Sequence, residues 1–258
     1  MRIYNTTHEL MSETGRNLLE MGIDVYPKTY QNKVIQGDPQ FHTKELMCEQ
    51  YCLLNMDDPD PLFVFSKDKD WADAEFQERI SPMPINPGEA YKLRPEVWEQ
   101  FLVKDYSGKM VMDYTYSERF RKAIVGNYRA DGPRRVSTDP LNEVISLLKR
   151  DTDTRKAILP IFTSGDVAYL DGSKRIPCSM YYNFLIRPDA RGEKRLNICY
   201  HQRSSDFVTH FGNDVYLAWR MMEYVASMVG VKPGNLIHTI DSLHVYSKDM
   251  EQLRGYFL

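Results

Sequence analysis

The second half of the chain carries a pattern of strand, turn, strand, helix and strand, and this pattern constrains the fold most. Two apolar, aromatic runs of strand length, Met180 to Arg187 and Leu196 to His201, are joined by a polar turn. An amphipathic helix pattern then runs from Asp214 to Val229 and is stopped by Gly230. Leu236 to Ile240 is predicted to form another strand. Such strands need helices over their apolar face, so the pattern predicts a sheet packed against helices.

The first half adds helices with recognisable ends. Thr6-Thr7-His8-Glu9 has the spacing of a capping box and predicts a helix that ends near Gly22. Trp71 to Ile80 has helical spacing, and Asp139-Pro140 begins a further helix with apolar residues on one face. Gly132 to Arg135 are predicted to form a turn. The mixture is an α+β fold, in which a mixed β-sheet is covered by helices.

Composition indicates a globular chain that needs no membrane. The 258 residues are 42% hydrophobic and 27% charged, and without repeats or low-complexity linkers they predict one domain, residues 1–258. A net charge of −3 gives no basic face for a nucleic-acid polymer. No apolar run reaches the ~20 residues of a membrane span, and no signal peptide is evident at the start. We therefore expect a cytoplasmic protein.

The cysteines do not predict a metal site. The four cysteines, at positions 48, 52, 178 and 199, lack the paired spacing of a zinc site, and few disulfides are expected in a cytosolic chain. Cys48 and Cys52 lie about one helical turn apart in an apolar run from Leu46 to Met56, whose periodicity fits either helix or strand. Both are predicted to be buried thiols.

Cys178 is the candidate nucleophile. A lone cysteine in an apolar region is more often a small buried hydrophobe. Cys178, however, follows Arg175 and Pro177, and Arg203 is expected on an adjacent strand. A neighbouring guanidinium lowers the pKa of a thiol from its usual value of about 8.5 and so raises the thiolate fraction.

Two basic pairs indicate an anionic small substrate. Arg203-Ser204 combines a planar guanidinium with a hydroxyl donor, which suits a phosphate. Arg155-Lys156, at the start of a predicted strand, is a second pair. Each pair alone is usually solvated surface, and only their combination points to a phosphate-bearing ligand.

Several acidic and aromatic residues near the predicted strand and helix ends could have either a functional or a structural role. Asp206, Asp214 and His244 lie in or beside apolar strands and helix ends, where they could face a substrate. Asp214 could equally be a helix N-cap, and that role would suffice to explain it. Tyr246 taken alone is more typical of a core tyrosine.

Four motifs in one order resemble the thymidylate synthase family. They are Pro177-Cys178, the run from Gln202 to Asp206, Pro233-Gly234, and the run from His244 to Ser247. The resemblance covers Asp139 to Ser247, and the spacing from Asp206 to His244 needs no gap.

The resemblance implies a thymidylate synthase-like fold, whose homodimer packs sheet to sheet. It implies a folate-dependent enzyme that uses 5,10-methylenetetrahydrofolate and acts on C5 of a pyrimidine nucleotide. Cys178 is then the nucleophile that adds to C6 of the base. Arg203 and Ser204 hold the 5′-phosphate, while Arg155 and Lys156 reach the phosphate bound by the partner subunit.

The resemblance also implies residues for the sugar and for closure over the phosphate. His244 and Tyr246 bind the deoxyribose hydroxyl. Gln202 and Asn213 belong to the nucleotide-binding side of the site. Lys28 matches the basic residue of an N-terminal loop that closes on the phosphate.

On the folate side, the resemblance implies a further set. Asp206 is a catalytic acid that binds the pterin of the reduced folate, and Trp98 lines the folate pocket. Tyr116 matches the active-site tyrosine of the family. The glutamate that organises proton transfers matches Glu75 best, with Glu78 as the alternative.

Asp214 is the most informative departure from the family pattern. Thymidylate synthases have Asn there, which donates to O4 of uracil and accepts from N3–H. Cytosine reverses this pattern, because its N4 amino group donates and its N3 accepts. A carboxyl group can accept from N4 and, when it or N3 carries a proton, complete the second bond. Asp214 therefore predicts a cytosine base.

Further departures point the same way. Ser179 follows the nucleophile where the synthases usually have His. Asn213-Asp214 and the run from Ser242 to Ser247 resemble the phage deoxycytidylate hydroxymethylases. The chain also ends at Leu258, without the long tail that closes the synthase site over folate, which leaves hydride transfer open.

These residues together predict hydroxymethylation of dCMP to 5-hydroxymethyl-dCMP, as used in DNA modification. Cys178 would form a covalent adduct at C6, and water near Glu75 would add to an exocyclic methylene. One alternative is a dCMP C5-methyltransferase that uses hydride from folate. Another is a dUMP hydroxymethylase or thymidylate synthase, if Asn213 faces the base. A non-catalytic nucleotide- or RNA-binding protein is the alternative from another class.

Overall fold

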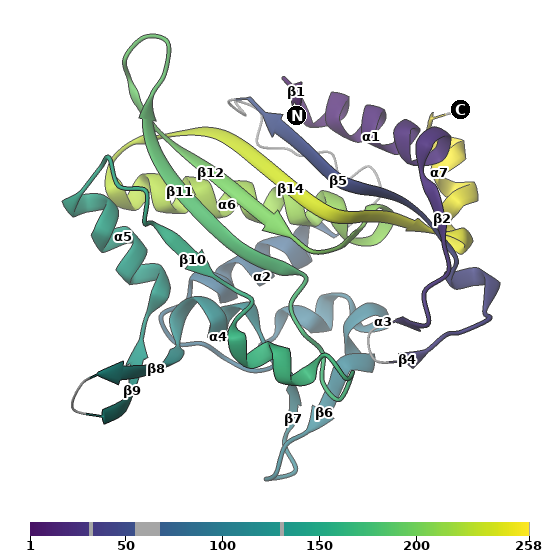
Figure 1. Ribbon diagram of the computed structural model, residues 1–258, viewed down its shortest axis with the longest axis horizontal. Coiled ribbons are helices and arrows are strands. Elements are labelled where there is room, and N and C mark those ends of the chain that lie inside the picture. Colours follow the sequence, from purple (N-terminus) through teal and green to yellow (C-terminus); the bar gives the residue numbers. More distant parts are fainter. Residues whose placement is uncertain (31–32, 55–67, 130–131, 258) are drawn as a thin grey trace.

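The computed structural model of the chain describes residues 1–30, 33–54, 68–129 and 132–257 (Figure 1). Eight strands within these ranges form one mixed sheet in the order β1-β5-β14-β12-β11-β10, with β13 beside β14 and β2 beside β5. The strands of this sheet are β1 (Arg2–Tyr4), β2 (Ile23–Val25), β5 (Thr43–Leu53), β10 (Ile158–Pro160), β11 (Ser179–Pro188), β12 (Lys194–Gln202), β13 (Ser205–Asp206) and β14 (Lys232–Tyr246).

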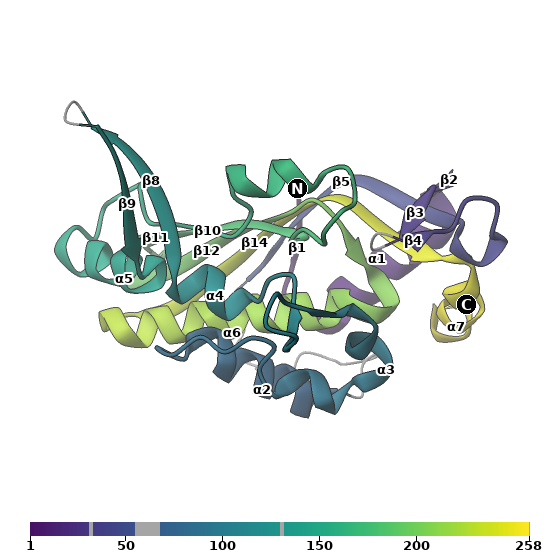
Figure 2. The same cartoon turned by 90° about the horizontal axis from the view of Figure 1, so that it is seen from below.

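Helices cover one face of this sheet. Helix α6 packs along β12 and β14, and α2 packs against α6 on the side away from the strands (Figure 1, Figure 2). The α+β class predicted from the sequence is therefore confirmed. The helices are α1 (Thr7–Met21), α2 (Lys69–Ile80), α3 (Pro95–Trp98), α4 (Tyr116–Arg121), α5 (Pro140–Arg150), α6 (Gly212–Val229) and α7 (Met250–Phe257).

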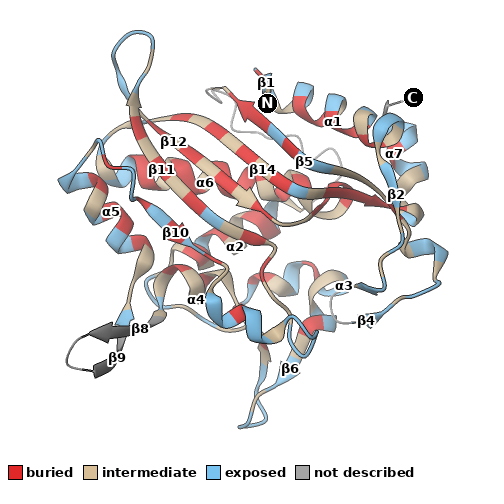
Figure 3. Cartoon of the chain, viewed as in Figure 1, coloured by how far each residue is buried: buried red, intermediate tan, exposed pale blue. Residues whose placement is uncertain are grey.

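The predicted strands of the second half are confirmed, and their burial alternates as a half-covered sheet requires. On β11, Tyr182, Phe184 and Ile186 are buried, while the residues between them are partly exposed (Figure 3). In Figure 1 the strands lie in front of α6, and no helix of the described residues covers the centre of the face toward the viewer. Tyr181 lies on this open face of the sheet, and 38% of the surface of this residue is exposed.

Strand β14 is much longer than the predicted run from Leu236 to Ile240. It pairs with β5 from Leu236 opposite Leu53 to Tyr246 opposite Thr43, and this long-range pairing extends it. Polar residues in the added part, such as Ser242, conceal the strand from a local pattern. The extension matters because it carries His244 and Tyr246 to the end of the sheet.

The predicted helix ends are confirmed where the signal is local. Thr6 Oγ1 accepts from the backbone N–H of Glu9 at 3.1 Å, and Glu9 Oε2 accepts from the N–H of Thr6 at 3.3 Å, which completes the capping box of α1. Asp139 Oδ1 accepts from the N–H of Asn142 at 3.0 Å at the start of α5. Helix α6 ends at Gly230, whose φ of 78° is left-handed.

The turn predicted from Gly132 to Arg135 is wrong. The residues from Gly132 to Arg135 are not a turn but part of a strand, in which Pro133 lies opposite Tyr128. A proline is tolerated there because the ribbon has only two strands and both are edges. The hairpin is one of three small ribbons among the described residues: β3 (Thr29–Tyr30) with β4 (Lys33–Val34), β6 (Leu102–Lys104) with β7 (Met110–Met112), and β8 (Ala123–Arg129) with β9 (Gly132–Thr138).

The prediction for Cys48 is also wrong. The run that contains it is strand β5, and Cys52 is buried as predicted, but Cys48 is exposed. The backbone at Cys48 has a φ of 53°, so the regular alternation of the strand is interrupted at this residue. No helix in the described ranges is long and apolar enough to cross a membrane.

Gly230 provides a test of this description of α6. Gly230→Ala should lower the free energy of unfolding by about 1–2 kcal/mol, because an L-residue is strained at this φ although its Cβ meets no atom within 4 Å. Gly255→Ala is the matched control: it also meets nothing within 4 Å, has no positive φ and lies in α7. It should be neutral or stabilise by up to about 1 kcal/mol. Equal stability of the two variants in urea titrations would contradict the assignment.

Candidate active site

A cavity of about 540 Å³ opens where β12, β13 and β14 end, between the N-terminus of α6 and helices α2 and α3. This volume is that of a typical small-ligand site. Most of the residues predicted from the sequence line it, although they come from distant parts of the chain. They are Glu75, Glu78, Trp98, Tyr116, Cys178, Gln202, Arg203, Ser204, Asp206, Asn213, Asp214, His244 and Tyr246.

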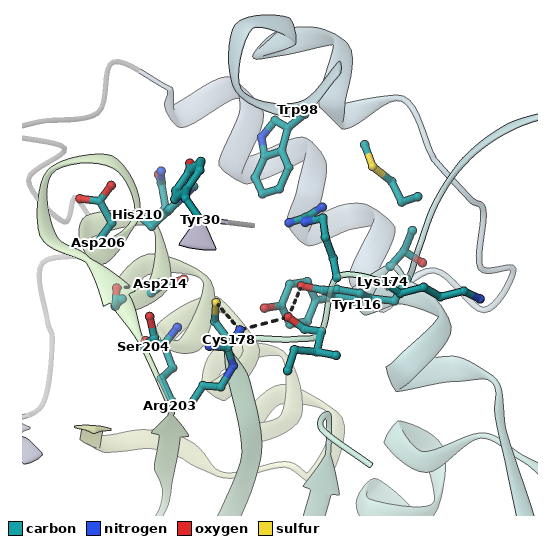
Figure 4. A pocket seen from close by; sticks show the side chains of 18 of the residues that line it. Tyr30, Trp98, Tyr116, Lys174, Cys178, Arg203, Ser204, Asp206, His210 and Asp214 are labelled. Atoms are coloured by element: carbon teal, nitrogen blue, oxygen red, sulfur yellow. Dashed lines mark hydrogen bonds between the residues drawn. The ribbon is translucent and has the colours of Figure 1, made fainter. Parts of the chain in front are cut away.

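Arg203 holds the segment that carries Cys178. Its Nε donates to the carbonyl oxygen of Pro177 at 2.9 Å, and its Nη2 lies 3.3 Å from the carbonyl oxygen of Ile176. The same Nη2 is 3.6 Å from Cys178 Sγ (Figure 4). Sequence reasoning therefore placed the guanidinium correctly beside the thiol.

The predicted effect of the guanidinium, which lowers the pKa of the thiol, is confirmed, but it does not determine the net shift. Burial raises the pKa of the Cys178 thiol above its ordinary value, and the charges of Arg203 and Arg175 offset only part of this rise. The negative charge of Asp214 raises this pKa further. The protonated thiol of Cys178 is therefore favoured in the free protein.

Asp214 is held at the start of α6 but does not cap it. Its Oδ2 accepts from Ser205 Oγ at 2.8 Å, and the side chain of Gln202, which also lines the cavity, favours its ionised form. Burial raises the pKa of Asp214 to about 6, against the lowering effects of these two side chains and of Arg79. Asn213 beside it is buried and donates to the carbonyl oxygen of Thr209 at 3.5 Å.

The capping role belongs to Asp206 instead. A π-helical turn, Phe207–Phe211, leads directly into α6, and Asp206 Oδ1 accepts from the N–H groups of Val208 and Thr209 at 3.1 and 3.3 Å. The N-cap reading of Asp214 is therefore wrong. Its carboxyl is held by side chains, and it lines the cavity rather than closing a helix.

The two candidate glutamates have different partners. Glu78 Oε1 accepts from the N–H groups of Glu89 and Ala90 at 2.6 and 2.8 Å, so it shapes a loop. Glu75 Oε1 accepts from Arg79 Nε at 2.8 Å. The guanidinium of Arg79 is buried and lies 4.0 Å from the ring centroid of Tyr116. Sequence reasoning missed Arg79, although its spacing of four residues from Glu75 was a signal.

A string of hydroxyls lies behind the nucleophile. Tyr116 Oη is 3.1 Å from Ser179 Oγ, which is 2.5 Å from Tyr200 Oη. Ser179 is buried and immediately follows Cys178. The departure to serine noted in the sequence thus allows three hydroxyls to bond in series.

An aromatic wall faces Cys178 across the cavity (Figure 4). Trp98 stacks on Trp71, with ring centroids 5.5 Å apart and planes at 15°. The buried indole N–H of Trp98 has no hydrogen-bond partner among the described residues. His210, which sequence reasoning did not identify, lies 5.9 Å from Trp98 between ring centroids. This wall suits a flat heteroaromatic ring, and the indole N–H offers it a donor.

The end of β14 closes another side of the cavity. His244 and Tyr246 are buried, and their ring centroids lie 5.1 Å apart. Tyr30 and Phe41 pack edge-on against Tyr246. Tyr30 also lines the cavity, and nothing in its local sequence indicated this. Tyr246 is therefore both a packed ring, as its sequence alone suggested, and part of the cavity wall.

Three predicted residues lie elsewhere in this chain. Arg155 and Lys156 are exposed just before β10 and do not line the cavity. Lys28 is exposed and does not line it either, although Tyr30 two residues later does. Lys174, like Arg79, is a basic residue that lines the cavity and that the sequence did not single out.

A comparison with protein families agrees with the motifs. A family model described as thymidylate synthase matches residues 89–257, well over half of the 258-residue chain. The matched region contains Trp98, Cys178 and Asp214, whereas Glu75 and Glu78 precede it.

The raised pKa of the Cys178 thiol can be measured by alkylation. Because only the thiolate reacts, the rate with iodoacetamide should rise about tenfold between pH 7 and pH 8 and continue to rise above pH 8. Arg203→Gln should slow the reaction further at each pH, since it removes a charge that lowers this pKa. Mass spectrometry of the Cys178 peptide, with Cys178→Ser as the blank, gives the rate. A plateau at or below pH 8 would contradict the account.

Proposed function

We propose that this chain, which belongs to the thymidylate synthase family, hydroxymethylates C5 of dCMP to form 5-hydroxymethyl-dCMP. Membership gives the coarse activity, a folate-dependent one-carbon transfer to C5 of a pyrimidine nucleotide with methylenetetrahydrofolate. The cytosine base and the hydroxymethyl product are the proposal. The observation that carries it is the carboxyl of Asp214, held in the cavity with a pKa of about 6.

The carboxyl of Asp214 complements cytosine better than uracil. One of its oxygens can accept from the N4 amino group, and a single proton shared with N3 completes the second bond. A pKa of about 6 allows that proton to lie on either partner near neutral pH. Uracil would place its O4 acceptor against a carboxylate, and a mispaired buried group costs roughly 1–3 kcal/mol.

The same proton assists the attack of Cys178. When Sγ bonds to C6, the electron pair of the C5–C6 bond moves into the ring toward N3. A proton held at N3 by Asp214 neutralises this charge as it develops, which is where stabilisation accelerates the step. Arg203, beside Sγ at 3.6 Å, favours the thiolate that attacks.

The cavity also has places for the remaining steps. Methylenetetrahydrofolate, when bound, supplies the one-carbon unit that C5 attacks, and Trp98 and Asp206 are the residues we assign to its ring. Loss of the C5 proton and of tetrahydrofolate leaves an exocyclic methylene on the nucleotide. Hydroxide from water bonds to this methylene, the C5–C6 double bond re-forms, and Sγ leaves C6 as thiolate.

We assign Glu75, rather than Glu78, as the general base that activates the water that adds to the methylene. A general base must be able to reach the water from which it takes the proton, so a carboxylate that holds a loop in place is less suited to the role. Glu78 is bonded to two backbone N–H groups of a loop, whereas Glu75 is bonded to the side chain of Arg79, next to Tyr116. This geometry supports Glu75 as the residue that takes the proton from water.

The assembly is part of the proposal. We propose a homodimer that buries the open face of the sheet, which would cover partly exposed Tyr181 and Ile158. Arg155 and Lys156 are exposed and outside their own cavity, which fits a role at the phosphate of the partner subunit. A cytoplasmic location, with dCMP and reduced folate as small-molecule partners, completes the proposal.

Asp214→Asn tests the base assignment. The wild-type protein with methylenetetrahydrofolate should convert dCMP, and the mass of the product should correspond to a hydroxymethyl group. In the variant, the ratio of kcat/KM for dCMP to that for dUMP should fall about 10- to 100-fold. Asp70→Asn, an exposed acid on α2, is the matched control and should leave the ratio unchanged.

Three outcomes would contradict the proposal in different ways. Turnover of dUMP alone would refute the reading of Asp214. A methyl product with a rise in dihydrofolate absorbance would show that hydride, not water, reaches the methylene. Activity that survives Cys178→Ala would refute the covalent mechanism.

The pH dependence of dCMP binding tests the shared proton. The complex holds one proton between Asp214 and N3, while the free carboxyl loses its proton above its pKa of about 6. Affinity should therefore weaken with rising pH, by up to about tenfold per unit between pH 6 and 8. The phosphate of dCMP also titrates near pH 6 and affects both proteins alike. To remove this effect, the dissociation constant of the wild-type protein for dCMP is divided by that of Asp214→Asn at each pH. A ratio that does not change with pH would exclude the shared proton.

A further inference from the structure

A buried row of hydrogen bonds runs beneath the cavity across three strands. Tyr51 Oη on β5 is 2.7 Å from His238 Nδ1 on β14. His238 Nε2 is 2.9 Å from Gln202 Oε1 on β12. Gln202 lines the cavity together with Asp214, and its side chain lowers the pKa of the Asp214 carboxyl. Tyr51 and His238 are fully buried, and Gln202 has 1% of its surface exposed. The row therefore connects the middle of the sheet to the carboxyl in the cavity.

The protonation of His238 fixes the direction of this row. Burial lowers the pKa of His238 to about 3, so its ring is neutral and has one donor and one acceptor nitrogen. The carbonyl oxygen of Gln202 can only accept, so Nε2 carries the hydrogen and Nδ1 accepts from Tyr51. The amide nitrogen of Gln202 is then left to donate to Asp214. Every hydrogen in the row points toward the cavity.

The opposite direction is less favourable at both ends. If Nδ1 carried the hydrogen, the Tyr51 hydroxyl would accept from it, and its own hydrogen would have no acceptor among the described residues. At the other end, the amide oxygen of Gln202 would face the carboxyl of Asp214, and two acceptors would meet. A buried polar group left unpaired is unfavourable, so the row has one stable direction.

The ring of His238 is also fixed in orientation. It stacks on Tyr200 with ring centroids 4.3 Å apart and planes at 15°, and Phe211 lies 6.3 Å away at 14°. Flipping of the ring, which would exchange its two nitrogens, is thereby hindered. A fixed ring can hold the flexible Gln202 side chain in one of its two amide orientations.

We propose that His238 is a positioning residue: by bonding to Gln202 it turns the Gln202 amide to donate to Asp214 and so sets which base Asp214 reads. The inference rests on the proposed function, since it takes Asp214 as the residue that reads the base. Sequence alone did not indicate His238, because its partner Tyr51 lies 187 residues away.

The side chain of Gln202 favours the ionised carboxyl of Asp214. Without His238, the amide can turn its oxygen toward that carboxyl, which disfavours the charge and raises the pKa. The other groups near Asp214 come from several elements and stay in place when only the bond between His238 and Gln202 is removed. The charged and titratable groups are Arg79, Cys178 and Asp206, and the tyrosines are Tyr51, Tyr182 and Tyr200.

His238→Phe is the direct test, because phenylalanine keeps a ring against Tyr200 and lacks both nitrogens. The pKa of Asp214 is followed in the free protein by carbon-13 NMR of its carboxyl, with Asp214→Asn to identify the signal. It should rise by about one unit, a tenfold change in the protonation equilibrium. The ratio of kcat/KM for dCMP to that for dUMP should also fall about tenfold, because the carboxyl is no longer held in one orientation.

Two further variants complete the test. His238→Gln can again donate to Gln202 Oε1, and it should recover most of the wild-type pKa and base preference. If His238→Phe does not fold, Tyr51→Phe, which removes only a hydroxyl, should shift the pKa in the same direction by a smaller amount. His8→Phe, at an exposed histidine on α1, should change neither quantity.

The outcomes separate this inference from the function on which it rests. Wild-type turnover of dCMP tests the proposed function by itself. If that turnover is present, an unchanged carboxyl pKa and base preference in folded His238→Phe or Tyr51→Phe would overturn the positioning role. If it is absent, the carbon-13 titration still shows whether His238 acts on Asp214, while the claim about the base fails with the function.

Discussion

The burial of one carboxyl group, that of Asp214, is the constraint around which the cavity is arranged. Burial raises the pKa of this carboxyl to about 6, and the negative charge of the carboxyl raises the pKa of the Cys178 thiol. The Ser205 hydroxyl and the Gln202 side chain keep it in place without neutralising it. The resulting site is poorly reactive when empty, because its thiol favours the protonated form and the negative charge of Asp214 opposes ionisation of the thiol. A base that shares a proton with Asp214 reduces this opposing charge.

The fold makes this arrangement by bringing strand ends and a helix start to one place. Strand β13 ends at Asp206, which caps the turn into α6 and so leaves Asp214 free of a capping role. The parallel pairing of β12 with β14 brings Gln202 into the layer of His238 and Ile240. The antiparallel pairing of β14 with β5 adds Tyr51 from the first quarter of the chain. The site therefore depends on contacts between residues far apart in sequence.

Local signals account for what could be predicted from the sequence. The capping box of α1, the Asp139 cap of α5 and the alternation in β11 and β12 each lie within a few neighbouring residues. The motifs around Cys178 and Arg203 likewise identified residues that line the cavity. General rules for how hairpins and crossovers connect neighbouring strands predict that these separate motifs come together in space.

What could not be predicted depends on distant partners or on opposing effects. Strand β14 extends to Tyr246 because β5 pairs with it along this length, and Tyr30 reaches the cavity from the two-residue strand β3. The pKa of Cys178 is the balance between burial and two guanidinium groups, and a sequence shows the charges but not the burial. Arg79 and His238 are buried polar residues whose roles appear only with their partners, Glu75 and Gln202.

A crystal structure with dCMP bound measures the central contact directly. The account predicts that one oxygen of Asp214 lies within hydrogen-bond distance of N4 and the other within that distance of N3, with Cys178 Sγ placed to reach C6. A base oriented with N3 and N4 away from Asp214, or a carboxyl beyond reach of both nitrogens, would contradict it.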